Sequence, residues 1–219
     1  MRLLAPFALV PLLALANGKV SGVVAYTGGR PWLPKPKVTE PSCRDAGVPN
    51  ETVLLADGGK ALANVVVFVE GAFDAGAPVA ERLERCTFTP HVQTAPQGTA
   101  LALSNGDAAL HNVKATAKVD GKERMVFDVA LPPGTHATKA TTGEVLKLSC
   151  DLHPWETSYL LLSAGPSTVS GADGAFELSL PAGRYIVNAW HERYGRRSAT
   201  VTVEDGLSVD PKLSFSDHP

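Results

Sequence analysis

Residues 144–164, EVLKLSCDLHPWETSYLLLSA, contain two short apolar runs separated by a polar loop. The first run alternates and ends at Cys150, and the second starts at residue 158. This pattern predicts two β-strands joined by a loop, because half-buried strands alternate with a period of two. The loop carries Cys150 and His153, whose thiolate and imidazole are both suitable metal ligands.

Short alternating or β-branched runs recur along most of the chain and predict an all-β fold. They occupy residues 19–26, 62–71, 99–105, 124–131, 175–180, 184–190, 198–205 and 212–217. Turn-forming stretches such as DGG, DGK, PPG and ADG separate them. Residues 78–86, PVAERLERC, fit either a short helix or an alternating edge strand. The stretch SAGPSTVSGADG at 163–174 is rich in small and turn-forming residues, which indicates a junction before a last β unit.

The N-terminus, MRLLAPFALVPLLALA, has the form of a secretory signal peptide. One positive charge precedes an apolar run that is too short to span a bilayer and ends in small residues. We therefore expect residues 1–16 to be removed after Ala16, and the mature protein to be exported to the periplasm or the extracellular space with no transmembrane segment. The formal net charge of −2 and the lack of a basic stripe argue against nucleic-acid binding.

The chain has three cysteines, Cys43, Cys86 and Cys150. In an oxidising compartment two of them normally pair and one is left over. We predict that Cys43 pairs with Cys86, which leaves the thiol beside His153 free. A metal ion is a good reason for an exported protein to keep a free thiol.

A second segment, LALSNGDAALHNVKA at 101–115, supplies another imidazole. A strand ends near Asn105, a turn follows, and His111 opens the next strand. Together with Cys150 and His153 it completes a set of two nitrogens and one sulfur. This set favours copper in a trigonal arrangement with a weak axial group, and zinc is the lesser possibility.

The segments NGDAALHNV and CDLHPWETSYL resemble the two metal-binding segments of cupredoxins. The likeness extends to exported bacterial proteins related to plastocyanin, which combine a cupredoxin core with a carboxypeptidase-regulatory-like, transthyretin-like β unit. LANVVVFVEG, CTFTPHV and GADGAFELSLPAGRYIVNAWHERYG resemble further segments of that family. The resemblance implies a Greek-key cupredoxin-like sandwich at 72–164 and a smaller β-sandwich at 165–219. Strands from residues 17–71 are expected to complete the smaller unit.

By this resemblance, His111, Cys150 and His153 are the equatorial copper ligands. The family often places a methionine directly after HPW, but this chain has Glu156 there. As a ligand, its anionic oxygen would stabilise Cu(II) over Cu(I). As a surface residue it would point to solvent, which is usual for carboxylates.

Other residues near these motifs have supporting roles in this interpretation. Asn105 and Asp107 are expected to form a turn rather than to ligate, because both residue types favour turns. Asn112 is expected to tie the His111 strand to the Cys150 loop, and Trp155 to cover the metal. His91 and His191 belong to the family-like segments. Each either lies near the metal, forms a separate site or is a hydrogen-bonded structural histidine.

The sequence therefore indicates a copper-binding protein that works in one-electron transfer or copper handling, with a redox or copper-handling protein as its partner. We expect no enzymatic activity of its own, because hydrolase and phosphate-loop motifs are missing from the sequence. The alternative is a non-catalytic β-sandwich module that binds a polysaccharide or a protein, with a structural or lost metal site.

Overall fold

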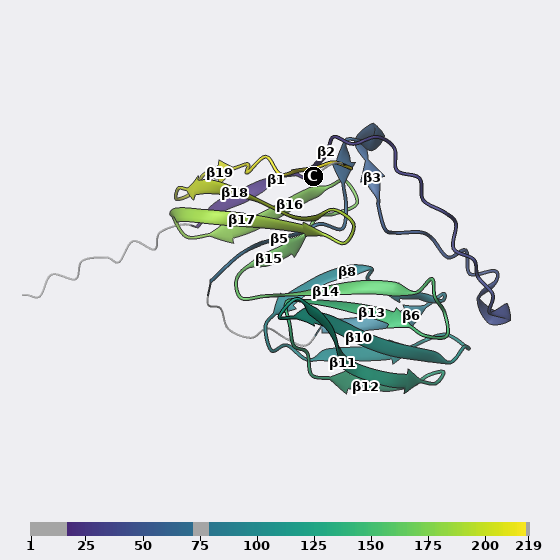
Figure 1. Cartoon of the computed structure of the whole chain (residues 1–219). Helices are drawn as coiled ribbons and strands as arrows, with labels where there is room; N and C mark the ends of the chain where they lie inside the picture. Colours follow the sequence, from purple (N-terminus) through teal and green to yellow (C-terminus); the bar gives the residue numbers. More distant parts are fainter. Residues whose placement is uncertain (1–16, 72–78, 218–219) are drawn as a thin grey trace, which may run out of the picture.

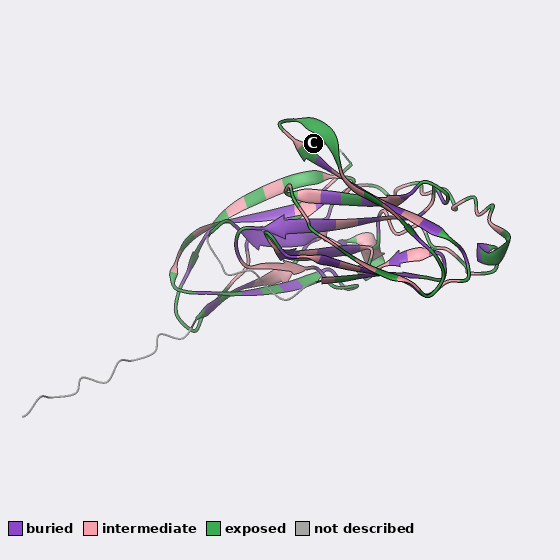
Figure 2. Ribbon diagram, turned by 90° about the horizontal axis from the view of Figure 1, so that it is seen from below, coloured by how far each residue is buried: buried purple, intermediate pink, exposed green. Residues whose placement is uncertain are grey.

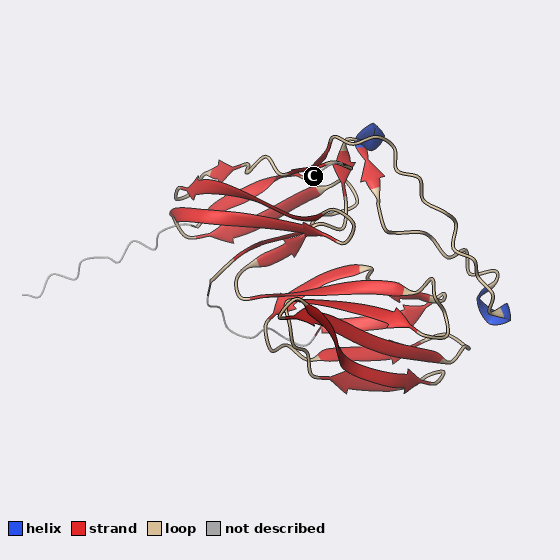
Figure 3. Ribbon diagram, viewed as in Figure 1, coloured by secondary structure: helices blue, strands red, loops and turns tan. Residues whose placement is uncertain are grey.

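The computed structural model describes residues 17–71 and 79–217, and the predicted signal peptide lies outside this part. The described residues form strands, turns and two single-turn 3₁₀ helices, η1 (Pro41–Cys43) and η2 (Asp57–Gly59) (Figure 3). The prediction of an all-β fold is confirmed. None of the helices in the described part is long and apolar enough to cross a membrane.

The middle of the chain forms a sandwich of two sheets, the lower body in Figure 1. Its strands are β6 (Val79–Glu84), β7 (Thr87–Thr89), β8 (Val92–Pro96), β9 (Leu101–Asn105), β10 (His111–Val119), β11 (Lys122–Leu131), β12 (His136–Lys139), β13 (Val145–Cys150) and β14 (Thr157–Ser163). One sheet has the order β11-β10-β13-β14-β8 and the other β12-β9-β6-β7. The pairs β14–β8 and β6–β9 are parallel, so the chain changes sheets instead of running as a simple meander.

Alternating burial explains how these strands build a core between the two sheets. In β10 and β13 every second side chain points inward, as in Val113 and Ala115 or Leu146 and Leu148. Residues 79–84 are likewise a strand and not a helix, with Glu81 and Leu83 buried. The expectation of an edge position for this strand was wrong, because β6 lies between β9 and β7.

The two ends of the chain together form the upper body. Its strands are β1 (Gly18–Val23), β2 (Ala25–Tyr26), β3 (Leu55–Ala56), β4 (Ala61–Leu62), β5 (Val66–Val69), β15 (Ser167–Val169), β16 (Ala175–Leu180), β17 (Gly183–His191), β18 (Gly195–Val203), β19 (Ser208–Val209) and β20 (Ser214–Phe215). They form three small sheets, ordered β16-β1-β19, β15-β5-β17-β18 and β20-β2-β4-β3. Antiparallel pairing of β1 with β16 and of β5 with β17 joins N-terminal to C-terminal strands. One apolar cluster fills this body. Seen from below, buried residues gather on the inner strands of the molecule and exposed residues on its outer loops and edges (Figure 2).

An apolar cluster and a long segment are two of the features that connect the bodies. An apolar cluster that includes Val66 and Phe68 of the upper body and Val92 and Leu161 of the lower body lies between them. The second feature is the segment between β2 and β3, residues 27–54, which we call the strap. It runs from the upper body along the side of the lower one (Figure 1), where the predicted Cys43–Cys86 disulfide is present.

Candidate metal centre

Strand pairing brings His111 and Cys150 to the same end of the lower sandwich. His111 is the first residue of β10 and Cys150 the last of β13, and the two strands pair with Val113 opposite Cys150. Beyond Cys150 the chain folds back. The Glu156 N–H donates to the His153 carbonyl at 2.9 Å, and the Cys150 N–H donates to the Glu156 carbonyl at 3.4 Å. This compact loop holds His153 and Glu156 beside Cys150.

The side chains of His111, Cys150, His153 and Glu156 converge, and each offers one donor atom within 4.8 Å of the others. The two Nδ1 atoms of His111 and His153 lie 3.1 Å apart, and Cys150 Sγ lies 3.6 Å from His153 Nδ1. Glu156 places Oε2 at 2.9 Å from His111 Nδ1 and Oε1 at 3.1 Å from His153 Nδ1. All four side chains are buried.

These separations fit the donors of a single metal ion. Nitrogen ligands about 2.0 Å from an ion and a thiolate about 2.3 Å from it are about 3.3 Å (N to N) and 3.5 Å (S to N) apart in a tetrahedron. The observed 3.1 and 3.6 Å agree with these values. Two neutral imidazoles, a thiolate and a carboxylate together make a donor set that suits copper or zinc.

His111 lies between two acidic groups, Cys150 and Glu156, which favour its protonated form. Burial alone would lower the pKa of His111, but the nearby Cys150 and Glu156 outweigh it and raise the pKa to about 9. A buried carboxylate needs a partner of opposite charge, because desolvation strongly disfavours an isolated charge. The protonated imidazole that the raised pKa of His111 favours is such a partner.

Glu156 points into this cluster, so of the two alternatives for this residue the solvent-facing one was wrong. The hydrogen bond from its own N–H to the His153 carbonyl turns the residue inward. Its Oε2 interacts with His111 at 2.9 Å. Its Oε1 lies at ion-pair distance from His153 but has no partner in hydrogen-bond geometry among the described residues.

Asn105 and Asn112 both stabilise the region around His111, Asn105 through its side chain and Asn112 through its backbone. Asn105 Nδ2 donates to the carbonyls of Ala109 and Leu131, both at 2.8 Å, and its Oδ1 accepts the Asp107 N–H. It therefore shapes the turn that leads to His111. The Asn112 N–H donates to Cys150 Sγ at 3.4 Å. This backbone contact, and not the amide side chain, links the His111 strand to the thiol.

The Arg85–Cys86 turn contacts Asp107 and Trp155, which are neighbours of His111 and His153. The sequence did not reveal these contacts. Asp107 accepts the N–H groups of Arg85 at 2.7 Å and Cys86 at 2.9 Å, and its Oδ2 lies 3.2 Å from His111 Nε2. That nitrogen is buried and the approach is outside hydrogen-bond geometry. The available signal was a carboxylate four residues before a candidate ligand histidine.

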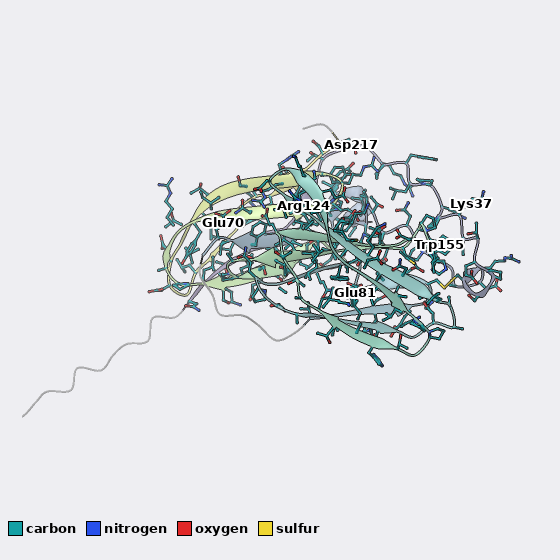
Figure 4. The ribbon with its side chains drawn as sticks, turned by 60° about the horizontal axis from the view of Figure 1, so that its bottom comes forward. Lys37, Glu70, Glu81, Arg124, Trp155 and Asp217 are labelled. Atoms are coloured by element: carbon teal, nitrogen blue, oxygen red, sulfur yellow. A yellow bond between two sulfur atoms is a disulfide. The ribbon has the colours of Figure 1, made fainter. Side chains whose placement is uncertain are left out.

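Trp155 covers the other histidine. Its indole stacks on the His153 ring, with centroids 5.1 Å apart and an interplanar angle of 30°. Its Nε1–H donates to the Cys86 carbonyl at 3.1 Å, so the disulfide-bearing turn also fixes this cover. Trp155 remains partly exposed and lies near the labelled Lys37 at one end of the molecule (Figure 4).

His91 and His191 lie outside the metal-capable cluster found among the described residues. His91 Nδ1 is 3.0 Å from the Thr157 carbonyl, and its Nε2 pairs with Glu192 of the upper body. Burial lowers the pKa of His91, but the hydrogen bond and charge of Glu192 raise it overall. His191 accepts the Arg193 N–H, and burial, followed by the charges of His91 and Arg193, lowers its pKa to about 4. Each histidine therefore has a hydrogen-bonded structural position.

Comparison with known proteins gave likenesses to solved structures only. No family model and no curated protein matched the chain. A purple cupredoxin from Nitrosopumilus maritimus is 22% identical and covers 39% of this chain and 99% of its own, with a TM-score of 0.33. Amicyanin from Paracoccus versutus is 18% identical over 46% of this chain and 99% of its own, with a TM-score of 0.34.

A third likeness is to an enzyme, the copper-containing nitrite reductase of Thermus scotoductus SA-01. It is 18% identical, covers 52% of this chain and 26% of its own, and has a TM-score of 0.33. Because these TM-scores are low, the chemistry assigned below rests on the donor geometry. The fold and the site define an all-β protein with a buried cluster of nitrogen, sulfur and oxygen donors.

Proposed function

We propose that this chain is an exported, cupredoxin-like protein that binds one copper ion through His111, Cys150, His153 and Glu156. Its work is one-electron transfer or copper handling, with a redox or copper-handling protein as partner. Bound copper would supply the change between Cu(II) and Cu(I). The sandwich would hold the four donors in place and keep bulk water away from them.

The observation that carries this proposal is the unsatisfied Oε1 of Glu156. It belongs to a fully buried carboxylate, and buried polar atoms are nearly always paired. A cation among the four donors would pair this oxygen and give both Nδ1 atoms, 3.1 Å apart, a common partner. Four protein donors also leave no evident position for a substrate, which favours electron transfer or metal handling over catalysis.

Copper is favoured over zinc by the combination of one thiolate with two imidazoles. The carboxylate makes zinc the competing ion, because a closed set of four ligands is typical of structural zinc sites. For the cellular location we propose export, supported by the N-terminal sequence and by the Cys43–Cys86 disulfide, which is typical of oxidising compartments.

The test is to load the mature protein with Cu(II) and record absorption and electron-spin-resonance spectra beside a Cys150→Ser variant. We expect an intense thiolate-to-copper band that the variant lacks, together with one copper per chain by metal analysis. Parallel loading with Zn(II) compares the two ions directly. If no such band forms and copper is removed by a desalting column, the copper proposal fails. The binding-module alternative then becomes the better explanation.

Replacing Glu156 by methionine tests the fourth ligand. A soft thioether in place of an anionic oxygen favours Cu(I). We expect the thiolate band to persist and the reduction potential to rise by at least about 60 mV, a tenfold change in relative preference for a one-electron couple. Spectroelectrochemical titration measures the reduction potential.

Asp151→Asn is the matched control, because Asp151 is an exposed acid of the same loop that pairs with Lys114. Equal potentials in wild type, Glu156→Met and control would remove Glu156 from the ligand set.

A further inference from the structure

A groove beside the candidate metal centre has no role in the function proposed above. It lies between the strap and the lower sandwich and encloses about 430 Å³. Ligand sites for small molecules commonly begin at about 300 Å³. Trp155 and Glu156 line one part of it, and Lys35 and Lys37 of the strap line another. We call it the strap groove.

The charges along the strap groove leave an excess of positive groups. Lys35, Lys37 and Lys147 line it from both sides, and none of them has an ion-pair partner among residues 17–71 and 79–217. Two of the acidic groups are already engaged. Glu192 pairs with His91, and Glu156 belongs to the histidine cluster. Glu51 is then the one remaining carboxylate that opposes three lysines.

The walls of the groove are partly apolar and carry planar side-chain rings. The partly exposed rings of Trp155 and Tyr159 line it, as do three strap prolines and Pro154 of the loop between β13 and β14. Aromatic and proline faces favour stacking of a planar ring. Pockets for small organic molecules combine such surfaces with a few polar groups that fix orientation. The ammonium groups of the lining lysines would pair with an anionic group of the ligand.

We propose that the strap groove binds a small planar organic anion of the aromatic carboxylate type. Its ring would lie against Trp155, and its carboxylate would face Lys35, Lys37 and Lys147. Binding to the groove does not depend on the metal. One consequence does rest on the proposed function: because Trp155 stacks on His153, the ligand lies one ring away from the donor cluster, and its binding alters the copper spectrum.

The binding test uses the full mature chain without metal. Isothermal titration calorimetry compares 4-hydroxybenzoate with 4-hydroxybenzamide, which has the same ring and no charge. We expect the anion to bind about tenfold more tightly than the amide. The variant Lys35→Gln/Lys37→Gln/Lys147→Gln is expected to lose that difference. Lys60→Gln/Lys118→Gln/Lys122→Gln, which removes three exposed lysines outside the groove, is the matched control and keeps it.

Equal affinities for the two probes, or no saturable binding of the anion, would overturn the proposed site. A second arm repeats the titration with copper-loaded protein and follows the thiolate-to-copper band. A shift that saturates with the calorimetric affinity, and that is lost in Trp155→Leu, supports the placement against Trp155. Binding with an unchanged band would overturn that placement. Failure to load copper removes the proposed function but leaves the metal-free titration as a complete test of the groove.

Discussion

Replacing Cys43 and Cys86 together by alanine is expected to lower the free energy of unfolding by about 4 kcal/mol in the chain-entropy model. The disulfide closes a loop of 43 residues, so its removal frees a long segment of the unfolded chain. In the folded state it is the covalent link between the strap and the lower sandwich. Urea denaturation of the metal-free double variant and wild type measures the difference.

Wild type in excess dithiothreitol is the control, because its stability should fall to that of the double variant. A loss below about 1 kcal/mol in both would mean that the strap is held mainly by packing, and that the entropic estimate does not apply here. The apolar contacts around the disulfide, which include Val38 and Val48 of the strap and Ala109 beside the metal centre, are the source of any such residual stability.

The same variant should also weaken metal binding. Cys86 contributes its carbonyl to Trp155 and its N–H to Asp107, so the turn touches partners of both His153 and His111. Loss of such outer partners typically lowers metal affinity about 10- to 100-fold. We therefore expect copper to bind the double variant with the same type of spectrum but with affinity reduced within that range. A competition titration with a chelator measures it.

The strand pattern and the placing of two donor side chains on one loop could be predicted because both are local in sequence. Period-two alternation shows directly which side of a strand is buried, as in β13, and the spacing of Cys150 and His153 places two donors on one loop. The inward direction of Glu156 is different. It depends on how the loop between β13 and β14 closes through backbone hydrogen bonds, and residue spacing carries no information on that.

The contacts between segments distant in sequence could not be predicted from the sequence either. His91 and Glu192 are 101 residues apart, and only the packing of the two bodies brings them together. Asp107 lies in the bend between β9 and β10, but its approach to His111 depends on the Arg85–Cys86 turn that holds its carboxylate. Such positions are set by tertiary structure, and single-sequence patterns report mainly local structure.

Glu81 is a buried acid that opposes the stability of the lower sandwich at neutral pH. Alternation along β6 places it inward beside Leu83, and it is 1% exposed. Gln93 donates to its Oε2 at 2.6 Å, but Oε1 and the nearby Ser158 Oγ have no hydrogen-bond partner among the described residues. Burial raises the pKa of Glu81 to about 8, because desolvation outweighs the lowering effects of the Gln93 hydrogen bond and the Arg82 charge.

This shift predicts that stability falls as pH rises. The unfolded chain releases the Glu81 proton near its ordinary pKa of 4.5, whereas the folded protein holds it up to about pH 8. Between these values folding takes up a proton, so the contribution of Glu81 becomes steadily less favourable, and it is constant outside this window. Glu81→Gln removes the charge, and its amide can accept from Gln93 and donate to Ser158. We expect a gain of about 3 kcal/mol at pH 7 and little change at pH 4.

Urea unfolding of Glu81→Gln and wild type at pH 4, 6, 7 and 8 tests this, with the difference between the two proteins as the measured quantity. Glu84→Gln is the matched control, since Glu84 is an exposed acid on the same strand whose partner is Arg82. A gain for Glu81→Gln that grows with pH, beside a flat response for Glu84→Gln, identifies the buried carboxyl as the cause. If Glu81→Gln lowers stability equally at every pH, the carboxylate is satisfied by polar partners around β6 and desolvation does not control its ionisation.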